Sequence, residues 1–114
     1  MKLRITMKGG LCNNIYYPLD EMKKALRKFL KDKNSDRTVY LNFDKSKPVG
    51  KIISMELIEE DKDSISYDVE VDPLALSGDT IVSPLFSSKI SSPMVHGMGL
   101  VKNPCDIVEM KEIG

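Results

Sequence analysis

The feature that most constrains this chain is a strict alternation of apolar and polar residues from Ile65 to Val71. Every second side chain in it is large and apolar, while serine and two acidic residues occupy the positions between. Because successive side chains of a strand point to opposite faces of a sheet, the pattern predicts a strand with one buried and one solvated face. A helix would require a different period, so this part of the chain belongs to a β-sheet.

A second run of the same kind lies just before it, with Ile53, Met55 and Leu57 on one face. The two runs are separated by a charged turn at Glu59–Asp63, and Asp72-Pro73 ends the second. Two alternating runs joined by a short polar turn predict an antiparallel hairpin.

Further alternation predicts strands elsewhere. Residues 1–8 place Leu3, Ile5 and Met7 on one face, and Gly9-Gly10 ends this strand. Residues 39–43 alternate in the same way, with Val39, Leu41 and Phe43 on one face. Strand-like composition returns from Val95 to Val101, and a final strand is expected over residues 107–113.

One helix is expected near the N-terminus. Pro18 suits the first turn of a helix, and the acidic residues that follow favour the positive end of its dipole. Apolar residues then recur at helical spacing, while lysine and arginine cover the rest of the circumference from 23 to 31. This predicts an amphipathic helix. Its basic face is read as solvated, with nucleic-acid contact as the alternative.

Residues 73–93 contain three prolines, a glycine and six serines, so no long regular element is expected there. Their apolar residues indicate short packed turns, with a partner-contacting arm as the alternative. The whole pattern predicts one domain over residues 1–114 of the α+β class. We expect a small, mostly antiparallel, β-barrel-like sheet of five or six strands with one main N-terminal amphipathic helix.

The composition excludes several classes of protein. The 114 residues carry 17 basic and 17 acidic side chains, and a zero net charge argues against binding nucleic-acid phosphates. The basic face at 23–31 is offset by acids concentrated at 56–72. No apolar run approaches the roughly 20 residues of a membrane helix, and no secretory signal is apparent, so a soluble cytoplasmic protein is expected. Cys12 and Cys105 are read as lone buried thiols, with a bridge as the alternative.

Catalytic chemistry finds little support in the residues. His96 is the only histidine, so a nucleophile–base pair would have to join it to Ser91, Ser92 or Cys105, and none of these spacings is diagnostic. Two cysteines and one histidine fall short of a structural zinc site, and the Glu59-Glu60-Asp61 cluster lacks the pattern of a calcium loop. Gly97-Met98-Gly99 lacks the rest of a phosphate-binding motif, so a closely approached backbone or a bulge in a strand explains it better. No cofactor or metal is expected.

Three segments, in order along the chain, resemble a known family. The stretch Asn13-Asn14-Ile15-Tyr16-Tyr17-Pro18 before the helix is similar to the Asn-Gly-Arg-x-Tyr-Pro entry of tailed-phage prohead maturation proteases. Asn14 and Ile15 depart from it. The hairpin beginning at Val49-Gly50 resembles that family's V-G-x-V hairpin. The segment His96-Gly97-Met98-Gly99, with the strand after it, resembles the family's Ser-Ser-Arg-Gly-x-Gly segment. The resemblance implies the small β-barrel with flanking helices shared with herpesvirus assemblin proteases.

The same resemblance implies that the catalytic residues are missing. Met94 and Val95 stand where the family has its nucleophilic serine, and His96 stands where it has arginine. The family's histidine should fall within residues 39–44, at Asn42 or Phe43. Neither methionine nor valine can attack a carbonyl, and losing a triad member removes orders of magnitude in rate. No catalytic, cofactor-binding or metal-binding residue is therefore assigned.

These inferences lead us to expect a non-catalytic structural component of a bacteriophage or prophage particle: a capsid decoration, cement or head-assembly protein. Such a protein would be assembled in the host cytoplasm, reside in the virion, form a homo-oligomer and bind capsid or other virion proteins. It would use neither nucleic acid nor a membrane. Two alternatives stay open, an active serine-type endopeptidase that depends on His96 and a small intracellular protein-binding module unrelated to phages.

Overall fold

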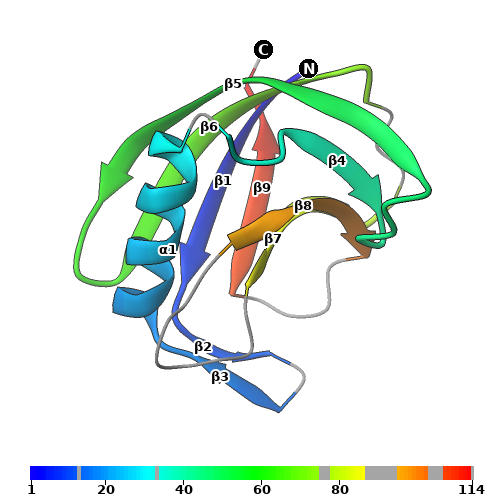
Figure 1. Cartoon of the computed structure of the whole chain (residues 1–114). Helices are drawn as coiled ribbons and strands as arrows, with labels where there is room; N and C mark the ends of the chain where they lie inside the picture. Colours follow the sequence, from blue (N-terminus) through cyan, green and yellow to red (C-terminus); the bar gives the residue numbers. More distant parts are fainter. Residues whose placement is uncertain (13, 33, 75–77, 87–94, 103–106, 114) are drawn as a thin grey trace.

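A computed structural model describes residues 1–12, 14–32, 34–74, 78–86, 95–102 and 107–113 (Figure 1). Most of these residues lie in one seven-stranded sheet with the strand order β7-β8-β4-β5-β6-β1-β9. Its strands are β1 (Lys2–Lys8), β4 (Thr38–Leu41), β5 (Pro48–Glu60), β6 (Ser64–Asp72), β7 (Thr80–Phe86), β8 (Val95–Lys102) and β9 (Val108–Glu112). A separate two-stranded sheet contains β2 (Gly10–Cys12) and β3 (Ile15–Tyr17), and the helix α1 spans Leu19–Lys31.

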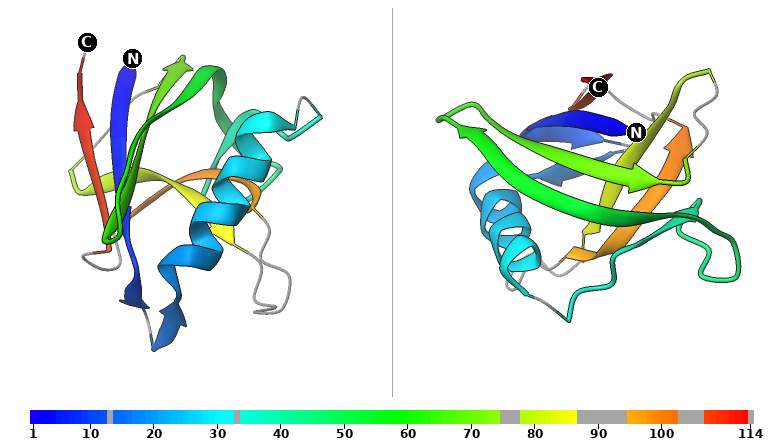
Figure 2. Two further views of the ribbon diagram at one scale, coloured as in Figure 1. Left: turned by 90° about the vertical axis from the view of Figure 1, so that its left-hand side faces the viewer. Right: turned by 90° about the horizontal axis from the view of Figure 1, so that it is seen from above.

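The large sheet curls until its two outer strands meet, as the two views in Figure 2 show. The backbone N–H of Val82 in β7 lies 3.4 Å from the sulfur of Met110 in β9. The result is a compact, nearly closed, barrel-like sheet with one helix among the described residues. The predicted α+β class and the predominance of strands are confirmed.

The pairing of β1, β5 and β6 follows the alternation in their sequences. β6 pairs antiparallel with both β5 and β1, and β1 also pairs antiparallel with β9. Apolar side chains of β1 and β6 that share the inner face are almost fully buried. They are Leu3, Ile5, Met7, Ile65, Tyr67, Val69 and Val71. The predicted strand at 1–8 and the hairpin across residues 59–63 are confirmed.

Polar side chains of β1 and β6 are joined in pairs across the two strands. Arg4 donates two hydrogen bonds to the carboxylate of Asp68, at 2.8 and 3.1 Å, and the Thr6 and Ser66 hydroxyls lie 2.9 Å apart. The hydrogen bond from Arg4 lowers the pKa of Asp68. The period-two pattern therefore separates an apolar interior from a polar layer of cross-strand pairs.

β5 departs from the predicted face at one position. Ile53 was expected to share a face with Met55 and Leu57, but a bulge shifts the register between Ile52 and Ser54. Ile52 is consequently buried, while Ile53 is 60% exposed. A bulge inserts one unpaired residue and so reverses which side chain faces the interior. A second shift occurs between Leu57 and Glu59.

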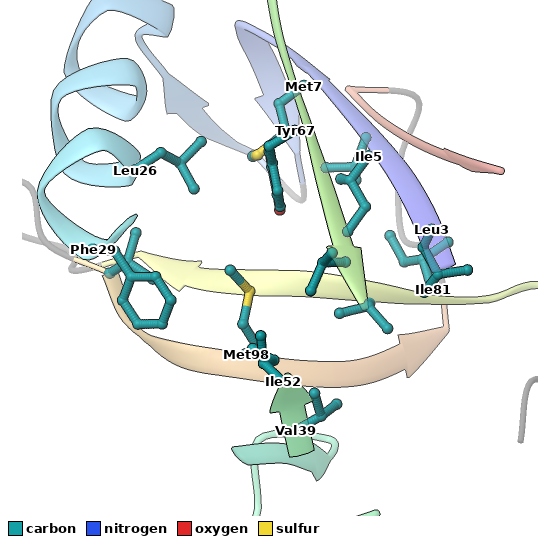
Figure 3. Close-up of a cluster of buried hydrophobic side chains, with 14 of the residues drawn as sticks. Leu3, Ile5, Met7, Leu26, Phe29, Val39, Ile52, Tyr67, Ile81 and Met98 are labelled. Carbon is teal, nitrogen blue, oxygen red and sulfur yellow. The ribbon is translucent and has the colours of Figure 1, made fainter. Parts of the chain in front are cut away.

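Helix α1 closes the part of the barrel wall that the short strand β4 does not reach. β4 has four residues and pairs with β5 only as far as Lys51, whereas β5 continues for nine further residues. α1 lies beside this second half of β5 and also contacts β8. In Figure 3 its Leu26 and Phe29 extend from the helix into the barrel interior, toward Tyr67 of β6 and Met98 of β8. Four α1 side chains enter the core: Met22, Ala25, Leu26 and Phe29.

Two basic residues at α1 do more than the sequence predicted. Lys23 was expected on the solvated face, but it is buried because its ammonium donates to the Asp61 carbonyl and lies 3.9 Å from Glu60. Beyond the helix, Arg37 donates to the carbonyl oxygens of Phe29 and Leu30 at 2.9 and 3.3 Å. These carbonyls have no partner within the helix, so Arg37 satisfies them.

The expectation of short turns throughout residues 73–93 was wrong for part of that segment. Thr80–Phe86 forms strand β7, which pairs antiparallel with β8, and Pro84 pairs with Met98 inside it. Proline is tolerated here because β7 is the last strand of the sheet and because the register shifts directly after Pro84. Residues 75–77 and 87–93 of the segment lie outside the described residues.

Candidate functional site

The β2–β3 hairpin extends from the barrel at the end opposite the two chain termini (Figure 1). It forms a sheet of its own, in which Gly10 pairs with Tyr17 and Leu11 pairs with Tyr16. The chain leaves β1 through Gly9 and Gly10, and Gly10 has a φ of +148° that an L side chain rarely adopts. Gly9-Gly10 ends the first strand as predicted, but the short hairpin that follows it was not expected.

Three large side chains of this hairpin are exposed to solvent. Leu11 is 67% exposed, Tyr16 is 62% exposed and Ile15 is 53% exposed. Neither this hairpin nor its flanks, from Gly9 to Leu19, contains a charged residue, although 30% of the chain is charged. Leu11 and Tyr16 are cross-strand partners and share one face of the hairpin, and exposed apolar side chains gathered on so short a segment mark a candidate interaction site. We call Leu11, Ile15 and Tyr16 the hairpin surface.

The base of the hairpin is fixed to the rest of the fold. The Lys8 N–H donates to the Ile107 carbonyl at 2.8 Å just before the hairpin, and Pro18 is the N-cap of α1 just after it. Cys12 forms a disulfide, so the prediction of a free thiol was wrong at this position. Cys105 lies outside the described residues. Anchoring at its base limits the motion of the hairpin surface and lowers the entropy lost on binding.

A second region gathers the residues singled out by the family resemblance. β4 and β8 pair in parallel, with Val39 opposite Met98, and the Asn42 N–H donates to the Leu100 carbonyl at 3.0 Å. Asn42 and Phe43 were expected to continue the strand, but both have positive φ angles, of 51° and 60°, and form a turn. The structure thus brings residues 42–43 beside the Gly97–Gly99 segment.

The chemistry available at this β4–β8 junction is largely apolar. Val95 is 8% exposed and Met98 is 1% exposed, so both side chains belong to the core. The side chain of His96 and the residues Ser91, Ser92 and Met94 lie outside the described part of the structure. Asn42 is exposed, and neither it nor Phe43 can act as the base of a triad.

Gly99 is closely approached, as the sequence suggested. A Cβ atom at Gly99 would lie 2.5 Å from Cδ1 of Phe43. We therefore expect Gly99→Ala to destabilise the protein by about 1–3 kcal/mol through overpacking. Chemical denaturation would measure this free energy of unfolding. In a Phe43→Ala background, Gly99→Ala should cost less, because the ring that the new Cβ would meet is gone. An equal cost of Gly99→Ala in both backgrounds would contradict the contact.

One hydrogen-bonded acid lies at the start of β4. The Tyr40 hydroxyl donates to Asp36 at 2.7 Å, and the Thr38 N–H donates to the same carboxylate at 3.0 Å. Burial acts to raise the pKa of Asp36, but these hydrogen bonds outweigh it and leave the pKa below its ordinary value. The same bond raises the pKa of Tyr40. The pair fixes the turn into β4 and holds Asp36 as an anion.

Within the described residues, no group of histidine, cysteine or acidic side chains could hold a metal ion. The same part of the chain contains no helix that is long and apolar enough to cross a membrane. The fold and its exposed features thus define a small barrel-like α+β protein with an apolar surface at one end. No family model, curated protein or solved structure matches the chain.

The sequence contained a signal for the hairpin surface that pattern analysis missed. The apolar residues on either side of Asn13-Asn14 were not predicted to form paired strands. The uncharged run from Gly9 to Leu19 in a highly charged chain was the available indication. A three-residue strand is too short for alternation to identify it.

Proposed function

We propose that this protein is a non-catalytic structural component of a bacteriophage or prophage particle, such as a decoration, cement or head-assembly protein, with a degenerate prohead-protease-like fold. The observation that carries this proposal is the hairpin surface: three exposed apolar side chains on an uncharged hairpin whose base is fixed to the rest of the fold. Surfaces of this kind suit protein–protein contact, in which exposed aromatic and aliphatic side chains enter a pocket of the partner.

The β4–β8 junction supports the same proposal. At the two positions that the family resemblance assigns to the histidine there is an exposed amide and an aromatic ring, and Val95 at the nucleophile position is packed in the core. Side chains that cannot act as a base or a nucleophile at these positions suit a role in assembly better than peptide hydrolysis. We propose that its partners are capsid or other virion proteins and that it resides in the virion.

The hairpin surface also sets a limit on how the partner binds. A buried aromatic side chain contributes roughly 150–250 Å², and a stable interface needs about 800 Å² per partner. Three side chains therefore anchor a contact but cannot supply all of it. We propose that the hairpin surface enters an uncharged apolar pocket on the capsid shell while neighbouring polar surface completes the interface.

The test measures binding to shells assembled from the major capsid protein encoded by the same phage or prophage. We expect Leu11→Ser combined with Tyr16→Ser to weaken co-sedimentation at least about tenfold, as loss of an anchor residue does. Leu85→Ser on β7, where Leu85 is 40% exposed, is the matched control and should bind normally.

Three results would overturn the proposal. One is equal binding by the hairpin variant and the Leu85 variant. Another is cleavage of scaffold or capsid protein that disappears in His96→Ala, which would establish the endopeptidase. The third is the absence of capsid, portal or terminase reading frames beside the gene, which would favour a binding module unrelated to phages.

A further inference from the structure

The solvent-facing side of α1 carries a row of lysines. Lys24, Lys28 and Lys31 are exposed and lie three or four positions apart, so they lie along one side of the helix. Among the described residues, Lys28 and Lys31 form no ion pair, and Lys24 reaches only Glu21 at 4.0 Å. We call these three residues the lysine row.

The second half of β5 carries the opposite charge. Glu56 and Glu59 are exposed, and neither forms an ion pair within the described part of the chain. Ile53 and Ile58 on the same strand are 60% and 41% exposed. Exposed isoleucines beside unpaired glutamates resemble an interface, where apolar contacts are combined with charged groups that select the partner. We call these four residues the β5 surface.

The lysine row and the β5 surface are neighbours that run in opposite directions. At one end Lys23 donates to the Asp61 carbonyl, just beyond the last residue of β5. At the other end Arg37 bonds both the Phe29 carbonyl of α1, at 2.9 Å, and the sulfur of Met55, at 3.0 Å. Along this side of the molecule, Lys24 therefore lies toward the Glu59 end of β5, and Lys28 lies toward the Glu56 end.

We propose that a second copy of this chain docks on this side, related by a two-fold axis that runs parallel to α1 between α1 and β5. Such an axis places each lysine row against the β5 surface of the other copy. It also leaves the position of every residue along the axis unchanged. Lys24 then faces the partner's Glu59, and Lys28 faces the partner's Glu56. Both contacts occur twice, as in any isologous dimer.

Charge selects this arrangement. A two-fold axis across α1 would instead lay one lysine row on the other, and like charges in contact are destabilising.

Sedimentation velocity on the full chain tests the dimer. We expect the wild type to dimerise at about 50 mM salt and its dissociation constant to rise about tenfold or more at about 500 mM, because exposed charge pairs are screened. Lys24→Glu with Lys28→Glu should give a monomer, and so should Glu56→Lys with Glu59→Lys. Mixing these two variants should restore a dimer, because their reversed charges are complementary. Lys102→Glu with Lys111→Glu is the matched control and should dimerise as the wild type does.

A monomeric wild type at low salt, an undisturbed dimer in either charge-reversed variant, or a mixture that stays monomeric would each overturn the proposal. Circular dichroism of every variant establishes folding, and restoration in the mixture requires two folded chains. The experiment needs no capsid protein. The hairpin variant Leu11→Ser/Tyr16→Ser should still dimerise, so failure of the dimer and failure of capsid binding are distinguishable.

Discussion

Replacing Leu26 by alanine should lower the free energy of unfolding by about 2–5 kcal/mol, the range for deleting a fully buried leucine side chain. Leu26 is 0% exposed and lies among the α1 side chains that fill the barrel wall beyond the end of β4 (Figure 3). Its loss leaves a cavity that the sheet cannot close, because strands on both sides are held by their own pairing. The melting temperature should fall by roughly 10–20 °C.

Leu30 on the same helix provides the matched control. It is only half-buried, so Leu30→Ala should cost about 1 kcal/mol or less. Both substitutions leave helix propensity nearly unchanged, and urea denaturation of the two variants therefore isolates the packing of α1 into the barrel. Equal losses for Leu26→Ala and Leu30→Ala would show that α1 does not fill the wall as described.

Replacing Tyr67 by phenylalanine should instead stabilise the protein, by about 1–3 kcal/mol. The Tyr67 side chain is 0% exposed, and its hydroxyl has no hydrogen-bond partner among the described residues. An unpaired buried hydroxyl loses its hydration without compensation, so its removal recovers that free energy. Burial also raises the pKa of Tyr67, and its absorbance should show no ionisation at alkaline pH until the protein unfolds.

Tyr40→Phe is the control with the opposite sign. The Tyr40 hydroxyl donates to the Asp36 carboxylate at 2.7 Å, so this substitution should destabilise the protein by about 1 kcal/mol. Thermal or urea unfolding at neutral pH compares the two. If Tyr67→Phe is also destabilising, the Tyr67 hydroxyl has a partner that the structure does not contain, such as a buried water.

The strands with one buried face were predictable because alternation encodes them directly. β1 and β6 needed only their period-two patterns, and the hairpin turn lies where its charged residues indicated. The face of Ile53 was not predictable, since a bulge changes the register without changing the composition. Strand β7 was hidden by Pro84, because proline reads as a breaker unless the strand is known to lie at the edge of a sheet.

The candidate site was harder to predict for a related reason. The resemblance directed attention to residues 42–43 and 97–99, which do lie together through the parallel pairing of β4 and β8. Parallel pairing joins segments that are distant in sequence, and no local pattern reveals it. The hairpin surface could not be predicted, because the solvent exposure of its side chains is set by the whole fold and not by the sequence of two three-residue strands.

The positions of the two ends of the structure have a practical meaning for such a protein. The Met1 ammonium donates to the Val71 carbonyl at 3.0 Å, and the Ile113 N–H donates to the Lys2 carbonyl at 3.0 Å. The two ends therefore emerge side by side at one pole, and the β2–β3 hairpin lies at the other (Figure 1). A label, tether or fused domain attached at either end leaves from the pole farthest from the hairpin. A fused domain would therefore project away from the partner, and the hairpin surface would stay free to bind that partner.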